Sequence, residues 1–305
     1  MALRSDENDA LSWLRLGEAY SKAGRHAAAL KALNKSHELQ PDDWMCVYHI
    51  GEVQRQTGQL SEAILTFKLA LEMKDNETVV LLSLAETYLE LGRGELSSGY
   101  LGRASTSFLF SISTSLELMS SSPGFRRLAW KTVSDALYAL SSFPNLSDSN
   151  LASSIFKKVE DLTSGHVMER LGGIVEPSET VGSSLEGFYI LRLAIISYDY
   201  RLSLFSSKEA GAAYAWFDLG VSLFRAASTS KSKSVQENAT KQAIESIRQA
   251  LLNEPGLAMF WIAFGNLHFE NDVMVAQHAY IKALEIDHKV FPLLVTGSKI
   301  IDISQ

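Results

Sequence analysis

The stretch Trp13-Leu-Arg-Leu-Gly-Glu-Ala-Tyr-Ser-Lys-Ala-Gly-Arg-His26 decides the fold, because its pattern of small and aromatic residues recurs along the chain. Gly17 returns as Gly51 and then as Ala85, which is a period of 34 residues. This period is typical of stacked helix-turn-helix units, in which each unit buries its apolar face against a neighbour. The spacing therefore predicts an all-α chain built from repeated helical hairpins.

Two kinds of small residue have separate roles in the predicted unit. Gly17, Gly51 and Ala85 are expected where the paired helix crosses, because a larger side chain would hold the two backbones apart. A left-handed residue should cap the end of each first helix, and the positions concerned are Gly24, Gly58 and Gly92. Pro41 is expected to stop the second helix of the first unit.

These positions resemble the tetratricopeptide pattern, which implies a right-handed α-solenoid with some degenerate repeats. The predicted segments are regular repeats at 1–92, irregular helical repeats with an elongated helix at 93–162, a loop or linker at 163–187, and helical repeats at 188–305 with an insertion at 228–238. The last helix, from Pro292 to Gln305, is apolar where a terminal repeat normally carries a polar cap. The sequence therefore predicts an open C-terminal edge, either because the chain is a fragment of a longer array or because something else covers that edge.

The composition narrows the class of protein. Of the 305 residues, 46% are hydrophobic and 21% are charged, and the net charge is −7, so unaided binding to nucleic acid is not expected. No apolar run is long enough to span a membrane, and no signal peptide opens the chain, which predicts a soluble, intracellular protein, with a nuclear pool also compatible. The single cysteine, Cys46, lies on an apolar helix face, where packing is the expected role.

No motif in the sequence indicates catalysis. A metalloprotease helix motif, a phosphate-binding loop, a nucleophile elbow and a dinucleotide fingerprint are all absent from the sequence. Three histidines lie ten residues apart, at His268, His278 and His288, whereas ligands on one helical face need spacings of three or four. We therefore expect neither an enzyme nor a bound cofactor or metal.

Three aligned rows on the first helices hold the candidate partner-binding residues. Two apolar rows and one acidic row recur at the repeat spacing and should line a concave groove: Leu11, Met45 and Val79; Leu14, Tyr48 and Leu82; Glu18, Glu52 and Glu86. Such a groove would suit a partner segment of alternating apolar and basic residues. Glutamate is a common helix former, so the acidic row alone would be ordinary. The two apolar rows favour a groove, because they would otherwise be exposed.

Several stretches go beyond a generic repeat: Trp13–His26, Ala2-Leu-Arg-Ser-Asp-Glu-Asn-Asp9, Ile50-Gly-Glu-Val-Gln-Arg-Gln-Thr-Gly58, Gly124-Phe-Arg-Arg-Leu-Ala-Trp130 and Trp216-Phe-Asp-Leu-Gly220. They resemble the tetratricopeptide scaffold subunits of superkiller (Ski) complexes in a fungal version. The resemblance implies a cytoplasmic scaffold that holds an RNA helicase and WD-repeat β-propeller subunits and supports 3′-to-5′ messenger RNA decay by the exosome. Exosome- or ribosome-associated factors would be further partners.

The family's propeller-binding motif is not carried over to this chain. The resemblance links propeller binding to a Gln-Arg-x-x-aromatic motif, whereas the Gln54-Arg55 pair is followed by Gly58 at the aromatic position. The family's subunits are far longer than 305 residues, which agrees with the missing cap.

Three alternatives remain open from the residues. A generic adaptor or a cochaperone would bind a peptide in the groove, but the positions of a carboxylate clamp hold Leu14, Glu18, His49, Val79 and Ser83. Direct RNA binding conflicts with the glutamates of the groove. The serine-rich run 228–234 could be a phosphorylation switch, and a disordered loop is the plainer interpretation.

Overall fold

The computed structural model describes residues 8–143, 146, 149–164, 187–206, 209 and 211–290. Every regular element within these residues is helical, and the predicted all-α class is confirmed. The chain divides into two compact units, residues 1–136 and 137–305. Most of the predicted linker and the predicted C-terminal edge lie outside the described residues, so both stay predictions.

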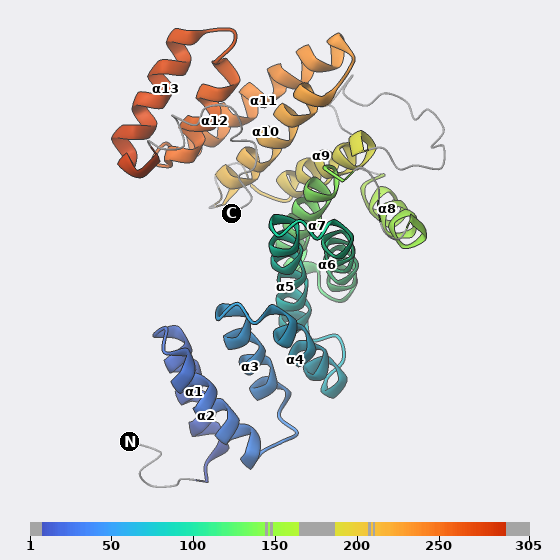
Figure 1. Cartoon of the computed structure of the whole chain (residues 1–305), viewed down its shortest axis with the longest axis vertical. Coiled ribbons are helices and arrows are strands. Elements are labelled where there is room, and N and C mark those ends of the chain that lie inside the picture. Colours follow the sequence, from blue (N-terminus) through green and yellow to red (C-terminus); the bar gives the residue numbers. More distant parts are fainter. Residues whose placement is uncertain are drawn as a thin grey trace. The chain divides into compact units, whose positions relative to one another are not determined.

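The first unit is a row of antiparallel helical hairpins (Figure 1). In chain order these are α1 (Ala10–Lys22) with α2 (His26–Leu39), α3 (Trp44–Gln56) with α4 (Leu60–Met73), and α5 (Thr78–Ser97) with α6 (Leu101–Ser121). The 3-10 turn η2 (Pro123–Phe125) leads into α7 (Arg126–Leu140), which runs across the boundary between the units. Core side chains from consecutive hairpins pack together: Phe67 of α4 lies in one cluster with Leu84 of α5.

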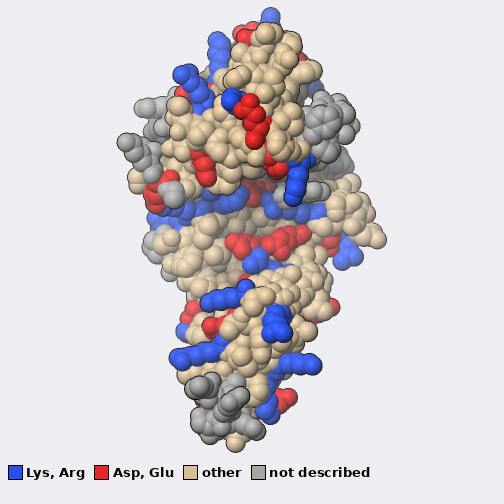
Figure 2. Space-filling view, turned by 90° about the vertical axis from the view of Figure 1, so that its left-hand side faces the viewer, with Lys and Arg blue, Asp and Glu red and all other residues tan. Residues whose placement is uncertain are grey.

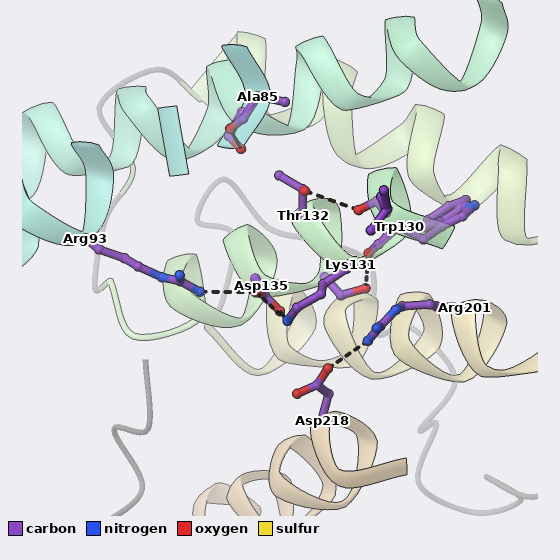
Figure 3. Close-up of polar contacts among 11 residues, drawn as sticks. Ala85, Arg93, Trp130, Lys131, Thr132, Asp135, Arg201 and Asp218 are labelled. Carbon is purple, nitrogen blue, oxygen red and sulfur yellow. Dashed lines mark hydrogen bonds and ion pairs between the residues drawn. The ribbon is translucent and has the colours of Figure 1, made fainter. Parts of the chain in front are cut away.

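The second unit repeats the hairpin arrangement after two further helices, α8 and α9. Its elements are α8 (Ser149–Thr163), α9 (Gly187–Ser203), α10 (Ala212–Thr229) with α11 (Lys233–Asn253), α12 (Ala258–His268) with α13 (Val273–Ile286), and the 3-10 turn η4 (His288–Val290). Arg201 on α9 is buried, and its Nη1 lies 2.7 Å from Asp218 Oδ2 on α10 (Figure 3). Because a buried cation is costly without a partner, this ion pair holds α9 against α10.

Close approach at glycine is confirmed in the first two hairpins. A Cβ on Gly17 would lie 2.6 Å from Leu33 Cγ, and one on Gly51 would lie 2.7 Å from Phe67 Cε1. The predicted caps Gly24 and Gly58 have positive φ angles of 70° and 79°. A left-handed residue at this place closes each helix without the steric cost that a side chain would bring.

The third hairpin corrects the predicted register by seven residues. Gly92 lies inside α5, where a Cβ would be 2.7 Å from Phe108 Cε1, so it is the crossing residue and not the cap. The cap is Gly99, with a φ angle of 81°, and Ala85 lies two turns before the crossing. Seven residues are close to two helical turns, so the apolar face continues unchanged and the repeat period hides the extension.

A buried hydrogen bond gives independent support for the corrected register. Ser36 Oγ on α2 donates to the carbonyl of Ala10 at 2.8 Å, and Ser111 Oγ on α6 donates to the carbonyl of Ala85 at 2.8 Å. Ala85 is therefore the counterpart of Ala10, not of Gly17. The elongated second helix expected in this region is present as α6, and its partner α5 is elongated as well.

The serine-rich insertion at 228–238 is mostly helical, which corrects the disordered loop expected at 228–234. α10 continues to Thr229 and α11 begins at Lys233, so only residues 230–232 connect the two helices. Gln236 Nε2 donates to the carbonyl of Ser230 at 2.7 Å and closes the connection. The extra residues lengthen the hairpin and leave its connection short.

Candidate partner-binding face

The apolar row of the first helices lies at the surface. Leu11, Met45 and Val79 stand in the first turns of α1, α3 and α5, and their exposed fractions are 53%, 41% and 36%. In α1 and α3 an N-cap aspartate holds this first turn in place. The Oδ1 of Asp9 accepts from the Leu11 amide at 3.2 Å, and that of Asp43 accepts from the Met45 amide at 3.0 Å. We call these three residues the apolar row.

The second predicted row is only partly available to a partner. Leu14 is 3% exposed and packs in a core cluster with Leu33 and Val53, so it is a core residue and not a groove residue. Tyr48 and Leu82 are half-buried, and the Tyr48 ring packs against Phe67 with centroids 6.0 Å apart. Leu11, Met45 and Val79 therefore lie at the surface, whereas Leu14 lies in the core.

The predicted acidic row is paired with side chains of the same chain. Glu18 Oε1 lies 2.9 Å from His49 Nε2, which joins α1 to α3. Arg55 on α3 lies 3.3 Å from Glu52, 3.6 Å from Glu86 and 2.8 Å from Glu90, which joins α3 to α5. The three glutamates are therefore part of an inter-helix network and not a free anionic wall.

The network continues from α5 to α7 within the first unit. Arg93 Nη2 lies 3.1 Å from Asp135 Oδ2, and Lys131 Nζ lies 3.0 Å from the same oxygen (Figure 3). Sequence reasoning missed the residues that pair with the glutamates and extend the network: His49, Arg55, Glu90, Arg93, Lys131 and Asp135. The local signals were Arg55 placed one turn after Glu52 and Asp135 placed one turn after Lys131.

Burial shifts the pKa values of three side chains on this face. Burial raises the pKa of the Glu86 carboxyl above its ordinary value, and Arg55 opposes the shift. Burial also lowers the pKa of His49, against the pull of Glu18, and raises that of Tyr48. The pKa shifts of Glu86 and His49 have opposite signs but one cause. Each group is partly removed from water, which disfavours its charged form.

Charged side chains of both signs lie on one face of the molecule (Figure 2). Figure 2 shows acidic side chains gathered in a band midway down the face in view, with basic side chains close beside them. Among the described residues, no three His, Cys, Asp or Glu side chains are grouped so that they could hold a metal ion. In the same part of the chain, no helix combines the length and the apolar character that crossing a membrane requires. The chemistry of this face is that of apolar contact and paired charge.

The fold and this face define the class of protein. Models of the tetratricopeptide repeat match residues 10–43 and 46–77, which are the first two hairpins. The solved structure of the Cut9–Hcn1 hetero-tetramer of the APC/C shares the fold, with a TM-score of 0.54 and 13% identity over 96% of this chain and 43% of that chain. The chain is an all-α protein with tetratricopeptide repeats.

The particular similarity is to the Superkiller 3 proteins. The chain is 29% identical over 282 residues to Superkiller protein 3 of Schizosaccharomyces pombe, covering 91% of this chain and 20% of that protein. It is 28% identical to Superkiller complex protein 3 of Mus musculus, covering 92% of this chain and 17% of that protein. The resemblance seen in the sequence is confirmed, and the chain spans about a fifth of the length of these relatives.

Proposed function

We propose that this chain is a non-catalytic scaffold segment of a Superkiller-type complex. In this proposal it helps to hold an RNA helicase and WD-repeat β-propeller subunits for 3′-to-5′ messenger RNA decay by the exosome in the cytoplasm. The observation that carries the proposal is the similarity over 92% of the chain to a protein named Superkiller complex protein 3. The hairpin architecture supports it, because stacked hairpins offer a long surface for protein partners.

The apolar row is the proposed contact within the first unit. Leu11 and Met45 are exposed at equivalent places of α1 and α3, and Val79 is exposed in the first turn of α5, two turns before the equivalent position. A partner that runs along the three helices could bury all three side chains. The glutamates beside them are already paired with Arg55 and His49. A basic partner segment would therefore gain little from them, and apolar contact should supply most of the affinity.

The pairing also decides which variants can test the proposal. Reversing Glu52 or Glu86 to lysine would place like charges beside Arg55 and disturb the packing of α3 on α5. Exchanging Leu11, Met45 and Val79 for serine changes only exposed side chains. Single surface changes of this kind usually alter stability by about 0.5 kcal/mol or less.

Co-purification from cytoplasmic extract tests the proposal. The tagged chain should recover the helicase and β-propeller subunits of the complex, identified by mass spectrometry. The triple serine variant should lose them, whereas Leu252→Ser, on a still more exposed leucine of α11, should keep them. Recovery of neither subunit by the folded wild-type chain would refute the proposed scaffold role.

A further inference from the structure

The outer side of α4 carries a surface that neither the fold nor the apolar row uses. Four residues spaced by three, four and three lie along one side of this helix: Glu62, Leu65, Leu69 and Glu72. We call them the α4 stripe. Leu65 is 68% exposed and Leu69 is 46% exposed, while the opposite side of the helix is buried through Ala63, Phe67 and Ala70.

The preceding repeat shows what the fold requires at these positions. Lys31 and Lys35 on α2 stand 34 residues before Leu65 and Leu69 and are also exposed. The same helical position thus accepts lysine in one repeat and has leucine in the next. Because solvent-facing positions of a repeat are ordinarily polar, the two leucines are not explained by folding.

The ends of the α4 stripe are anionic. Glu62 and Glu72 are exposed, and among the residues that the structure describes neither forms an ion pair. Lys68, the basic side chain of this helix, turns toward the next hairpin, where its Nζ lies 5.8 Å from the centroid of the Tyr88 ring. The stripe therefore has two adjacent leucines between two unpaired carboxylates.

We propose that the α4 stripe docks an amphipathic helix of another protein, in which two apolar residues a turn apart are flanked by lysine or arginine. The carboxylates lie ten residues apart in one helix, so the flanking charges of the partner must be about 15 Å apart. A helix with the spacing Lys-x-x-Leu-x-x-x-Leu-x-x-Lys meets this requirement in either direction. The inference does not depend on the proposed scaffold function.

The charge pattern argues against other occupants. In a second copy of this chain, pairing of the two stripes would bring glutamate opposite glutamate in both parallel and antiparallel arrangements. Anionic lipid surfaces and nucleic acids would meet the same two carboxylates. A protein helix with basic flanks is the occupant that satisfies both the leucines and the glutamates.

Two helical peptides can test the proposal directly on the whole chain. One carries the lysine-flanked spacing above, and the other has glutamate in place of both lysines; binding is followed by fluorescence anisotropy. The lysine-flanked peptide should bind saturably, and the glutamate-flanked peptide about tenfold more weakly or not at all. Absence of binding by both peptides, or equal binding of the two, would overturn the proposal.

Two variants locate the binding on the stripe. Leu65→Lys with Leu69→Lys, which installs the residues of α2, should abolish peptide binding and leave thermal unfolding unchanged. Glu62→Lys with Glu72→Lys should reverse the preference toward the glutamate-flanked peptide. Unfolding of the leucine variant would mean that the leucines serve the fold, and a wild-type dimer that this variant abolishes would identify a second copy as the occupant; either result refutes the proposal.

Discussion

Gly92 lies so close to the ring of Phe108 that a Cβ on the glycine would be 2.7 Å from Phe108 Cε1. The same relationship joins Gly17 to Leu33 and Gly51 to Phe67, with the same separation along the chain. Gly94, two residues later in the same helix, has no atom within 4 Å of the equivalent position. Gly92 and Gly94 therefore provide a matched test of the hairpin register.

Gly92→Ala should destabilise the chain by about 1–3 kcal/mol, because the fully buried Phe108 cannot move aside freely. Gly94→Ala should instead stabilise it by about 0.5–1 kcal/mol, since alanine loses less backbone freedom in a helix. Urea denaturation of the two variants gives both values. Equal effects of the two substitutions would show that Gly92 is not the crossing residue.

Arg55 is expected to contribute more to stability than a typical surface arginine. Arg55→Ala leaves Glu52, Glu86 and Glu90 without their common cation, and it should cost about 1–2 kcal/mol. Arg248 is the control: its 3.8 Å pair with Glu245 is exposed, so Arg248→Ala should cost about 0.5 kcal/mol or less. A cost for Arg55→Ala no larger than for the control would contradict the network described above.

The raised pKa of Glu86 predicts a pH-dependent effect on stability. Because the pKa of Glu86 is higher in the folded state than in the unfolded state, protonation of this carboxyl stabilises the fold. This stabilisation is fully present below the unfolded pKa and is lost as the pH rises through the folded pKa. Glu86→Gln should therefore be more stable than the wild type at pH 7. The difference should shrink as the pH falls through the folded pKa of Glu86 and should be smallest below the ordinary value of 4.5. Thermal unfolding across this range measures it, and a variant less stable than wild type at pH 7 would show that the pair with Arg55 outweighs burial.

The period of 34 residues was enough to predict the hairpins, the first two crossing glycines and their caps. It failed at α5, because an insertion of two helical turns returns the chain to the same face and leaves the apolar pattern intact. Only the spatial partners Phe108 and Ser111 identify Gly92 and Ala85 correctly. The helical insertion at 228–238 was hidden for another reason, since serine and lysine are common in both loops and exposed helices.

The candidate site was predictable only in part. The exposed positions Leu11 and Met45 followed from periodicity, whereas Val79 lies in the two extra turns of α5. The burial of Leu14 depends on how α1 is turned toward α3. The pairing of the glutamates through Arg55 is a contact between helices, and the spacing within one helix carries no information about it. The three glutamates suggested an anionic face, but the structure pairs them with His49 and Arg55.

Binding of purified subunits tests the central claim, which is the scaffold role, most directly. The wild-type chain is titrated by biolayer interferometry against the purified RNA helicase and β-propeller subunits of the Superkiller-type complex of its source organism. The account predicts saturable binding to at least one subunit, weakened about tenfold or more when Leu11, Met45 and Val79 are exchanged for serine and unchanged by Leu252→Ser. The contradicting result is a folded wild-type chain that binds neither subunit up to about 100 μM.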